Sequence, residues 1–332
     1  MKRVVMIGLI VVLGVVIVAG AVRLSGHDPV AAAIGLVQGA FGSASAFGGT
    51  LREATPLLIA GLAAFVALKA GLFNIGVDGQ LVVGALAATV IGLRLPGPAG
   101  LLLGILAAIV AGAFWAAPAG LIRAYRGGHE VISTIMLNRI AVLGTNALVA
   151  GPFLDRTAGS ATTANLPSSS MLPNLLSTPL TLTLAIPVGI VLVLAIGWWL
   201  GKTVSGFELR AVGANPRAAL FAGVQSPQVT VRAMLLSGAI AGFAGAMLVF
   251  TDTGRFYTDF SPGYGFDALG VALLAGPLAI GVIPAALVFG ALAKGGTALA
   301  TDGIPKSITT VILGVLILLA GAIRFSQGRS RG

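Results

Sequence analysis

Two apolar stretches of the sequence are each interrupted by glycines and an acidic residue. The first is Gly71-Leu-Phe-Asn-Ile-Gly-Val-Asp-Gly-Gln80, and the second is Gly263-Tyr-Gly-Phe-Asp267. Glycine permits an unwound backbone, and polar side chains inside a bilayer are costly unless they face protein or water. Such breaks at corresponding places in two halves of a membrane chain indicate a solute path. The alternative is that both segments are merely loops between membrane spans.

Residues for covalent chemistry are scarce. The sequence contains no cysteine and only two histidines, His27 and His129, which lie far apart. This excludes thiol nucleophiles and thiolate metal sites, and it leaves no cluster for a catalytic centre. The segment Gly197–Thr203 imitates a phosphate-binding loop, but three residues separate its glycines where the motif requires four. We therefore expect no catalytic residue, no metal and no cofactor.

The composition places these segments in a membrane protein. Of the 332 residues, 57% are hydrophobic and 9% are charged, and the mean hydropathy is +1.03. Soluble domains carry about 25% charged residues. The net charge of +10 comes from basic residues that mostly stand singly between apolar runs, which favours membrane topology over nucleic-acid binding. The predicted fold class is an all-α polytopic membrane protein, with residues 1–332 forming a single transmembrane domain.

The sequence predicts about ten transmembrane helices, because crossing a bilayer takes roughly 20 apolar residues. The predicted spans are 4–22, 55–70, 79–94, 98–122, 131–151, 179–200, 230–250, 265–279, 280–298 and 305–324. The splits at Gly71–Asp78 and Gly276–Gly281 leave eight or nine spans as alternatives. The weakly apolar stretch 31–49 is expected to be interfacial or re-entrant. The first span is predicted to be an uncleaved helix, since its apolar run is longer than that of a signal peptide.

Basic residues set the expected orientation, because they accumulate on the cytoplasmic side. The cytoplasmic set is Lys2, Arg3, Lys69, Arg123, Arg126, Lys202, Arg210, Arg217, Arg324, Arg329 and Arg331. The smaller outer set is Arg23, Arg52, Arg94, Arg156, Arg255 and Lys306. Both termini are therefore predicted to be cytoplasmic, the loop 152–178 extracytoplasmic and the loop 201–228 cytoplasmic.

The predicted cytoplasmic loop carries helix-start patterns. Ser205-Gly-Phe-Glu208 fits a capping box, and Asn215-Pro216 fits a helix start with proline in the first turn. Gly213 is expected to end the first helix, so the predicted helices are Phe207–Val212 and Pro216–Val224. They form either a docking surface for a cytosolic partner or a loop that satisfies only itself.

The span beginning near Glu130 contains a basic residue well inside its apolar run. Arg139 is expected to pair with an acid or line a cavity if it lies deep in the bilayer. A shifted span would instead let its side chain extend to the interface. His129 is interpreted as an interfacial residue and not as a proton relay.

Four segments resemble the inner-membrane permeases of ABC transporters of the simple-sugar and nucleoside branch. Phe73-Asn-Ile-Gly-Val-Asp-Gly-Gln80 is similar to the family's FNIGxEGQ motif, and His129-Glu-Val-Ile-Ser-Thr-Ile-Met-Leu-Asn138 is similar to its EVISTIMLN segment. The run from Phe207 to Ala219 resembles the loop that contacts the ATPase. Gly263-Tyr-Gly-Phe-Asp267 and the following Val271-Ala-Leu-Leu resemble the GYGFDxIAVALL region. The resemblance covers Phe73 to about Leu274.

The resemblance implies a type II importer permease in the cytoplasmic membrane. Its expected partners are a cytosolic ABC ATPase, a second permease subunit in a hetero- or homodimer, an extracytoplasmic substrate-binding lipoprotein and the lipid bilayer. Nucleosides are the expected substrates, with simple sugars second. The expected substrate-path residues are Phe73, Asn74, Asp78, Gln80, Asn138, Phe266 and Asp267. The expected ATPase-coupling residues are Phe207, Glu208, Arg210, Gly213, Asn215, Pro216 and Arg217.

The sequence departs from the family pattern at three places. Asp78 stands where the family usually has Glu, and Arg139 stands where it usually has an aromatic residue. Gly276-Pro277-Leu278 lacks an Asn that relatives often carry near the proline. None of these changes touches the docking motif.

The alternative function is an ion-coupled secondary transporter or channel that works without an ATPase, with Asp78 and Asp267 as proton or sodium ligands. The docking helices distinguish the two, since a carrier acting alone does not need them. A membrane enzyme ranks third, because the sequence shows no catalytic cluster.

Overall fold

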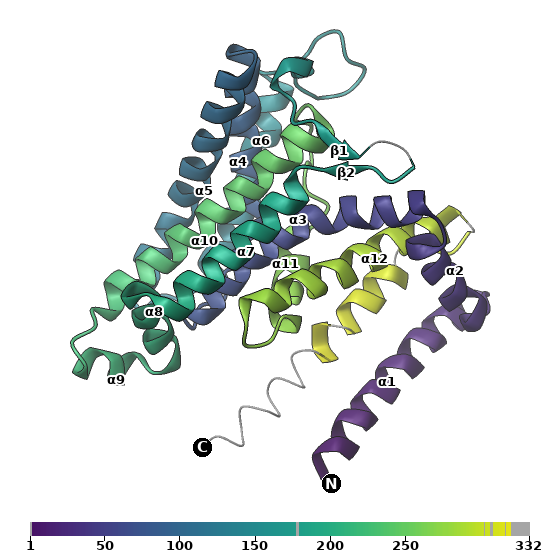
Figure 1. Ribbon diagram of the computed structural model, residues 1–332, viewed down its shortest axis with the longest axis horizontal. Helices are drawn as coiled ribbons and strands as arrows, with labels where there is room; N and C mark the ends of the chain where they lie inside the picture. Colours follow the sequence, from purple (N-terminus) through teal and green to yellow (C-terminus); the bar gives the residue numbers. More distant parts are fainter. Residues whose placement is uncertain (1, 177–178, 302, 306–307, 316, 320–332) are drawn as a thin grey trace.

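The computed structural model describes residues 2–176, 179–301, 303–305, 308–315 and 317–319, and for residues 2–11 it describes the backbone only. The protein is a bundle of helices with one pair of short antiparallel strands (Figure 1). The helices are α1 (Lys2–Leu24), α2 (Pro29–Phe41), α3 (Ala44–Lys69), α4 (Val77–Arg94), α5 (Pro98–Arg126), α6 (Glu130–Ala150), α7 (Ala185–Lys202), α8 (Val204–Ala214), α9 (Pro216–Phe221), α10 (Ser226–Leu248), α11 (Tyr264–Leu274) and α12 (Val282–Thr301). The strands are β1 (Asn174–Leu176) and β2 (Leu182–Thr183).

Seven helical segments of the described chain are long and apolar enough to cross a membrane. They are α3, α4, α5, α6, α7, α10 with its π-helical end (Val249–Thr253), and α12 with a preceding 3-10 turn (Ala279–Gly281). The predicted class of helical, multi-pass membrane protein is confirmed, and the expected count of about ten is approximate. The remaining predicted spans lie in helices that are bent, short or only partly described.

The predicted span 265–279 is not a full crossing. Its helix, α11, has 11 residues, which at ~1.5 Å per residue covers about 16 Å, roughly half of a hydrocarbon core. The helix ends there because Gly276, with a φ of +73°, and Pro277 follow it. Of the predicted span 305–324, an apolar helix is described within Ile308–Leu319. The basic residues Lys306, Arg324, Arg329 and Arg331 lie outside the described residues.

The weakly apolar stretch 31–49 forms most of α2 and the start of α3, and α2 forms a bent pair with α1, a geometry found both in broken spans and in re-entrant loops. The axes of α1 and α2 meet at 102°, at a turn that includes Gly26 with a φ of +85°. Asp28 caps α2, since its carboxylate accepts hydrogen bonds from the amides of Val30 and Ala31. Ser43 caps α3 in the same way through Ala46. This cap starts α3 at Ala44, eleven residues before the predicted span 55–70.

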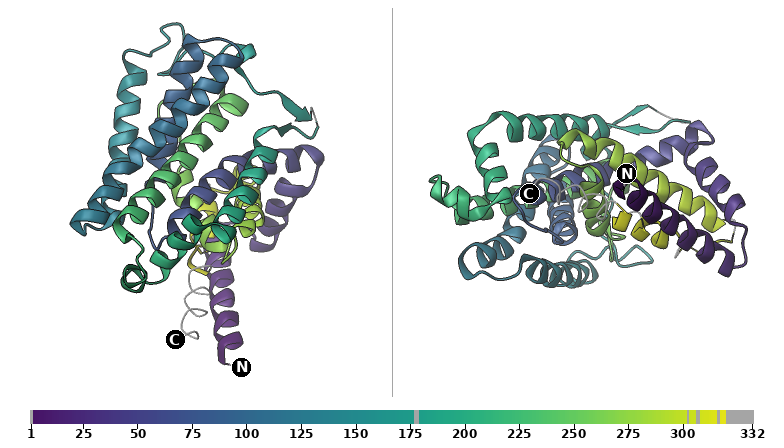
Figure 2. Two further views of the ribbon diagram at one scale, coloured as in Figure 1. Left: turned by 60° about the vertical axis from the view of Figure 1, so that its left-hand side comes forward. Right: turned by 90° about the horizontal axis from the view of Figure 1, so that it is seen from below.

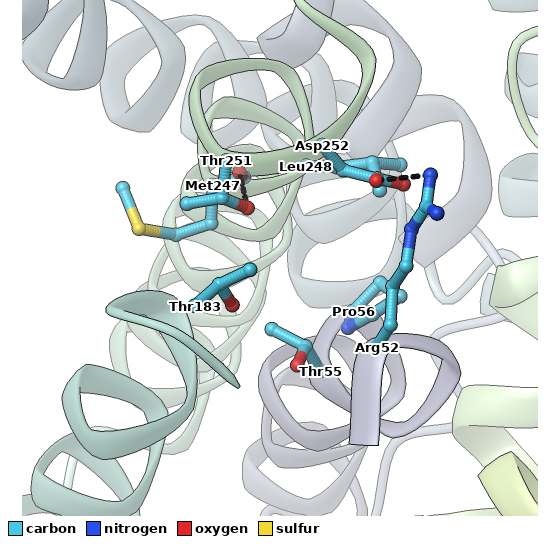
Figure 3. A pocket seen from close by; sticks show the side chains of 8 residues that line it. All are labelled: Arg52, Thr55, Pro56, Thr183, Met247, Leu248, Thr251 and Asp252. Carbon is cyan, nitrogen blue, oxygen red and sulfur yellow. Dashed lines mark hydrogen bonds and ion pairs between the residues drawn. The ribbon is translucent and has the colours of Figure 1, made fainter. Parts of the chain in front are cut away.

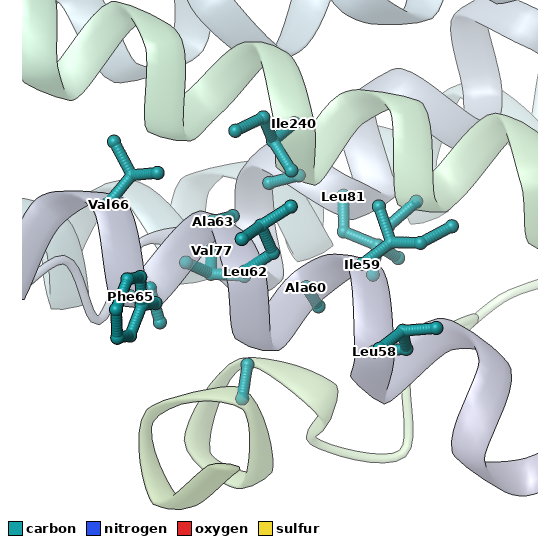
Figure 4. Packing of buried hydrophobic residues seen from close by; sticks show 14 of the residues in the cluster. Leu58, Ile59, Ala60, Leu62, Ala63, Phe65, Val66, Val77, Leu81 and Ile240 are labelled. Atoms are coloured by element: carbon teal, nitrogen blue, oxygen red, sulfur yellow. The ribbon is translucent and has the colours of Figure 1, made fainter. Parts of the chain in front are cut away.

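The core lies where α3, α4 and α10 meet, and Figure 4 shows side chains of the three helices packed together. Leu62 and Phe65 of α3 and Leu81 of α4 are fully buried. The helices approach closely because glycines stand at their contacts. A Cβ on Gly242 of α10 would clash with the carbonyl oxygen of Ala108 on α5. Small residues at such crossings are typical of helix packing in membranes.

Helices α5, α6 and α7 lie around this core (Figure 2). Apolar side chains on these helices are exposed. On α6 the exposed residues recur at helical spacing, and they include Ile132, Met136, Ile140 and Leu143. The opposite stripe of α6, which includes Thr134, Ala141 and Thr145, is buried. An apolar outer face on long helices fits contact with lipid or with another membrane subunit.

The short elements gather at two ends of the bundle (Figure 1). Helices α8 and α9 lie at one end, and strands β1 and β2 lie at the other. Helix α3 joins the two regions: its first residues lie beside the strands, and its last residue contacts α8. Two candidate sites are therefore positioned by the two ends of one helix.

Candidate functional site

The first glycine-interrupted segment is the break between α3 and α4. The chain turns at Gly71, whose φ is +74°, and α4 begins at Val77. The amide of Asn74 donates to the Gln80 side-chain oxygen at 2.9 Å and to the Ser237 hydroxyl at 2.8 Å. Gln80 donates back to Asn74 at 3.1 Å, and Ser237 donates to the Ala63 carbonyl at 2.7 Å. This closed network ties the break to α3 and α10.

Residues of the segment 129–138 hold the same break from the side of α6. The Asn138 side chain donates to the Ile75 carbonyl at 2.8 Å and accepts from the Gly79 amide at 2.9 Å. Glu130, which is 4% exposed, accepts weakly from the Phe73 amide at 3.4 Å and pairs with Arg123 at 3.3 Å. The sequence-distant motifs at 73–80 and 129–138 thus form one structure.

The second glycine-interrupted segment meets the first at Asp78. The Asp78 carboxylate accepts from the Ser261 hydroxyl at 2.5 Å and from the Gly265 amide at 3.0 Å. The carboxylate therefore sits at the start of α11, where a negative charge is favourable. A Cβ on Gly265 would clash with the Cβ of Asp78, so only glycine permits this approach.

The predicted substrate-path residues divide by exposure. Phe73 and Phe266 are 45% and 59% exposed, and Asp78, Asn138 and Asp267 are partly buried. Asn74 and Gln80 are 0% and 1% exposed and bond to each other. These two amides do not line an open path in this conformation, because their polar groups are used to hold the break together. Their role in the substrate path stays a prediction, and in this conformation their side chains hold the break together.

The two helices predicted in the loop 201–228 for docking are present as α8 and α9, but the first begins earlier than predicted. Thr203, and not Ser205, caps α8, since its hydroxyl accepts from the Gly206 amide at 3.1 Å. Ser205 lies inside the helix and accepts from the Trp199 indole at 2.9 Å. The predicted capping box with Glu208 is therefore wrong. Thr203 is the cap because it lies directly after α7 with an extended backbone.

The predicted role of Gly213 as a helix breaker is also wrong. Gly213 lies inside α8, which continues to Ala214. A Cβ at this position would clash with the Lys69 carbonyl oxygen and would lie 2.9 Å from the Gly71 amide nitrogen. Gly213 is a contact point at which α8 touches the end of α3 and the start of the break.

The start of the second docking helix is as predicted. The Asn215 side chain accepts from the amides of Arg217 and Ala218 at 3.0 and 3.1 Å, and Pro216 opens the helix. Helix α9 ends at Phe221 instead of Val224.

The two docking helices expose aromatic and basic side chains together. Phe207 on α8 and Phe221 on α9 are 60% and 93% exposed, and Arg210 and Arg217 are exposed as well. Glu208 is partly buried. Exposed aromatic and arginine side chains are typical of a docking surface.

A polar pocket at the opposite end of α3 is not predicted from the sequence. Arg52 of α3 forms an ion pair with Asp252 in the π-helical end of α10. Figure 3 shows both side chains beside Thr55, Thr183 and Thr251. The sequence places Arg52 only in the outer basic set, although it lies inside α3. The acids near this end, Glu53 and Asp252, are a signal of the pocket, but no spacing rule connects Arg52 to a residue 200 positions away.

Arg139 is exposed on α6 and has no ion pair or hydrogen bond among the described residues. His129 is exposed and directly precedes α6. Among the described residues no group of His, Cys, Asp and Glu could hold a metal ion. The predicted partner or cavity of Arg139 is thus not found within this part of the chain.

Comparison with known proteins identifies relatives along nearly the whole chain. Residues 46–321 match the family described as branched-chain amino acid transport system / permease component. The chain is 35% identical to the guanosine ABC transporter permease protein NupP of Bacillus subtilis, over 92% of this chain and 90% of that protein. It is 32% identical to the nucleoside ABC transporter permease protein NupB of Lactococcus lactis, over 90% and 85%.

A third relative is named for a different substrate. The glucose ABC transporter permease protein TsgB13 of Haloferax volcanii is 36% identical over 81% of this chain and 74% of its own. No solved structure matches the chain.

Proposed function

The chain belongs to the permease-component family of ABC transporters, and on this basis we propose that it forms the membrane path of an ATP-driven importer of nucleosides. As a permease it is a transport subunit and a multi-pass membrane protein. The observation that carries the nucleoside proposal is the 35% identity to a guanosine permease over 92% of the chain. Simple sugars are the second candidate, since a glucose permease is 36% identical.

The proposed partners follow from the permease role. A cytosolic ABC ATPase would dock on α8 and α9, whose exposed residues include Phe207, Arg210, Arg217 and Phe221. A second permease subunit would complete the path, and an extracytoplasmic lipoprotein would deliver the substrate. The proposed location is the cytoplasmic membrane, with the N-terminus and α8–α9 on the cytoplasmic side.

The proposed coupling mechanism uses the contact between α8 and α3. Movement of a docked ATPase would displace α8, and Gly213 contacts the backbone of Lys69 and Gly71 without an intervening side chain. The displacement would reach the α3–α4 break directly. Asp78 then connects this break to the start of α11 through Ser261 and Gly265. Glycine contacts leave little room for side chains to absorb the motion, because packed interiors are stiff and transmit strain.

The proposed path residues are the accessible predicted ones at the α3–α4 break, at the start of α4, on α6 and in the first turn of α11. Phe73 and Phe266 expose aromatic rings, and Asp78, Asn138 and Asp267 are partly exposed polar groups. A nucleoside needs an aromatic face for its base and hydrogen-bonding groups for its polar atoms. Asn74 and Gln80 would act by holding the break in place.

The test uses the complete transporter, with ATPase and binding protein, reconstituted in proteoliposomes. Uptake of a labelled purine nucleoside, a labelled pyrimidine nucleoside and labelled glucose is measured with and without ATP. The proposal expects ATP-dependent uptake of nucleosides in excess of glucose. Preferential uptake of glucose would select the second candidate, and uptake driven by an ion gradient without ATP would overturn the ABC mechanism.

The docking role is tested by Arg210→Glu, with Arg126→Glu as the matched control. Both arginines are exposed, and Arg126 lies at the end of α5. Charge reversal at Arg210 should abolish substrate-stimulated ATP hydrolysis, while the control keeps it and both variants insert into the membrane. Equal stimulation in the two variants would refute the assignment.

A further inference from the structure

The pocket at the outer end of α3 is large and lined by polar groups from four parts of the chain. Its volume is about 400 Å³, within the range of roughly 300–1,000 Å³ for small-molecule sites. Arg52 comes from α3, Asp252 from the end of α10 and Lys294 from α12. The lining from the strand region is Asn174, Thr181 and Thr183. A separate void of about 10 Å³ shares Arg52, Thr183, Thr251 and Asp252 with this pocket, and Pro56 and Met247 line that void (Figure 3).

One hydroxyl in this pocket has no partner. Thr183 is 7% exposed, and its side-chain oxygen is buried without a hydrogen bond among the described residues. Two nearby threonines differ, since the Thr251 hydroxyl of the same pocket donates to the Met247 carbonyl, and the Thr55 hydroxyl of the adjoining void donates to the Leu51 carbonyl. Burying a hydroxyl without a hydrogen-bond partner is energetically unfavourable. Such a group calls for an explanation, and a ligand that supplies the missing bond is one.

The pocket lining carries two cationic side chains, Arg52 and Lys294, and one carboxylate, Asp252, and only two of these three are paired with each other. Arg52 pairs with Asp252, and their side chains are 59% and 22% exposed. Lys294 has neither a hydrogen bond nor an ion pair with another described residue, although Glu53 is near enough for electrostatic interaction. The pocket thus offers donors from Arg52 and Lys294 and acceptors from Asp252. Donors and an acceptor side by side suit hydroxyl groups, because a hydroxyl can accept from Arg52 or Lys294 and donate to Asp252.

The lining of the pocket does not suit the base of a nucleoside. No aromatic side chain lines the pocket in the described chain, so a base would find no ring to stack on. Adjacent hydroxyls, in contrast, are bound by a carboxylate in many ribose sites. We infer that this pocket is a binding site for the vicinal hydroxyls of a ribose or a simple sugar. The inference rests on the proposed function and names the part of the substrate that is recognised.

The location of the pocket fits a first binding position. Arg52 and Lys69 are separated by about 25 Å at ~1.5 Å per residue of helix, and Lys69 contacts α8. The pocket therefore lies at the far end of α3 from the docking helices. A substrate arriving from the extracytoplasmic side would meet it before the α3–α4 break.

The test compares substrates that differ only in their hydroxyls. The reconstituted transporter is assayed for uptake of a ribonucleoside and of its 2′,3′-dideoxy analogue, with the same binding protein throughout. Thr183→Val and Lys294→Met are the variants, and Thr157→Val, on a threonine of the exposed loop after α6, is the matched control. Neither variant removes a hydrogen bond or ion pair seen within the described chain, so assembly should be preserved.

The expected result is a KM for the ribonucleoside that rises about tenfold, the effect of losing one hydrogen bond of ordinary strength. The KM for the dideoxy analogue and the kcat should stay unchanged, and the control should match the natural protein. An unchanged ratio of the two KM values in both variants would overturn the inference. So would failure of Thr183→Val to assemble, since it would show that this hydroxyl holds the protein together.

The outcome separates this inference from the proposed function. If the natural transporter carries neither nucleosides nor simple sugars, the proposed function fails and the hydroxyl site fails with it. If the natural transporter carries nucleosides and both variants leave the ratio of the two KM values unchanged, the proposed function stands and only the proposed hydroxyl site is wrong.

Discussion

The polar side chains near the two ends of α3 differ in whether their hydrogen-bonding groups have partners. At the end near α8, the side chains of Asn74, Gln80 and Ser237 bond to one another or to backbone. At the other end, the Thr183 hydroxyl has no partner and Lys294 has no ion pair within the described chain. In the first region these amide and hydroxyl groups are bonded within the protein, whereas in the second region the Thr183 hydroxyl and the Lys294 ammonium are not bonded to the described chain.

This difference separates two kinds of polar residue in a membrane protein. Asn74 and Gln80 stand out in the sequence because they interrupt an apolar run, yet their task is to satisfy an unwound backbone and each other. Thr183 and Lys294 do not stand out, yet they line a pocket of about 400 Å³. A polar group whose bonds are used contributes to stability, and one whose bonds are free is available to a ligand.

The largest effect on transporter function is expected where α8 contacts the end of α3 at the α3–α4 break. Gly213→Val would place side-chain atoms against the Lys69 carbonyl oxygen. This oxygen is so close to Gly213 that even a Cβ atom would clash with it. Helix α8 must then move off α3, so substrate-stimulated ATP hydrolysis should be lost. Gly201→Val is the control, because no atom lies within 4 Å of the point where its Cβ would stand. Retained stimulation in Gly213→Val would show that this contact does not couple the two regions.

A smaller effect, on stability, is expected from breaking the hydrogen bonds among Asn74, Gln80 and Ser237. Gln80→Leu removes both hydrogen bonds with Asn74 and leaves a buried amide partly unsatisfied, at a cost of about 1–2 kcal/mol. The melting temperature of the purified permease should fall. Gln38→Leu, on an exposed residue of α2, should leave the melting temperature near that of the natural protein. Equal melting temperatures for the two variants would mean that the network is not a stabilising element.

The junction of the two interrupted segments should show a more modest energetic effect. Asp78→Asn keeps the shape of the side chain but removes the charge at the start of α11, worth roughly 0.3–1 kcal/mol. The permease should still assemble, and uptake should fall severalfold as the position of α11 becomes less fixed. The experiment measures uptake and complex assembly together. Unchanged uptake would separate Asp78 from transport.

The smallest loss of stability is expected at the pocket near the start of α3. Thr183→Val removes a buried hydroxyl that has no hydrogen bond within the described chain, so the free energy of unfolding should stay the same or rise. Thr134→Val is the contrast, since that buried hydroxyl donates to the Glu130 carbonyl at 2.8 Å, and its loss should cost about 0.6 kcal/mol or more. Thermal unfolding of the two purified variants measures both changes. A larger loss for Thr183 than for Thr134 would reverse the comparison between the two ends.

Much of the site could be predicted from local patterns. The interrupted segments at 71–80 and 263–267, and the helix start at Asn215-Pro216, depend on residues close together in sequence. The cap of α8 is misplaced in the prediction because Ser205 and Thr203 are both suitable, and the end of α7 decides between them. The short length of α11 is not predicted, because an apolar run gives no measure of where the backbone turns.

The membrane class, the family and the segments where helices break could all be inferred from the order of the amino acids. These properties follow from hydropathy and from motifs of contiguous residues, which need no knowledge of distant contacts. The three-dimensional arrangement was needed to show that Asn74 and Gln80 satisfy each other, that Gly213 contacts α3, and that Arg52 and Lys294 share one pocket. Burial and hydrogen-bond satisfaction depend on which residues meet in space, and packed helices bring together residues that are hundreds of positions apart.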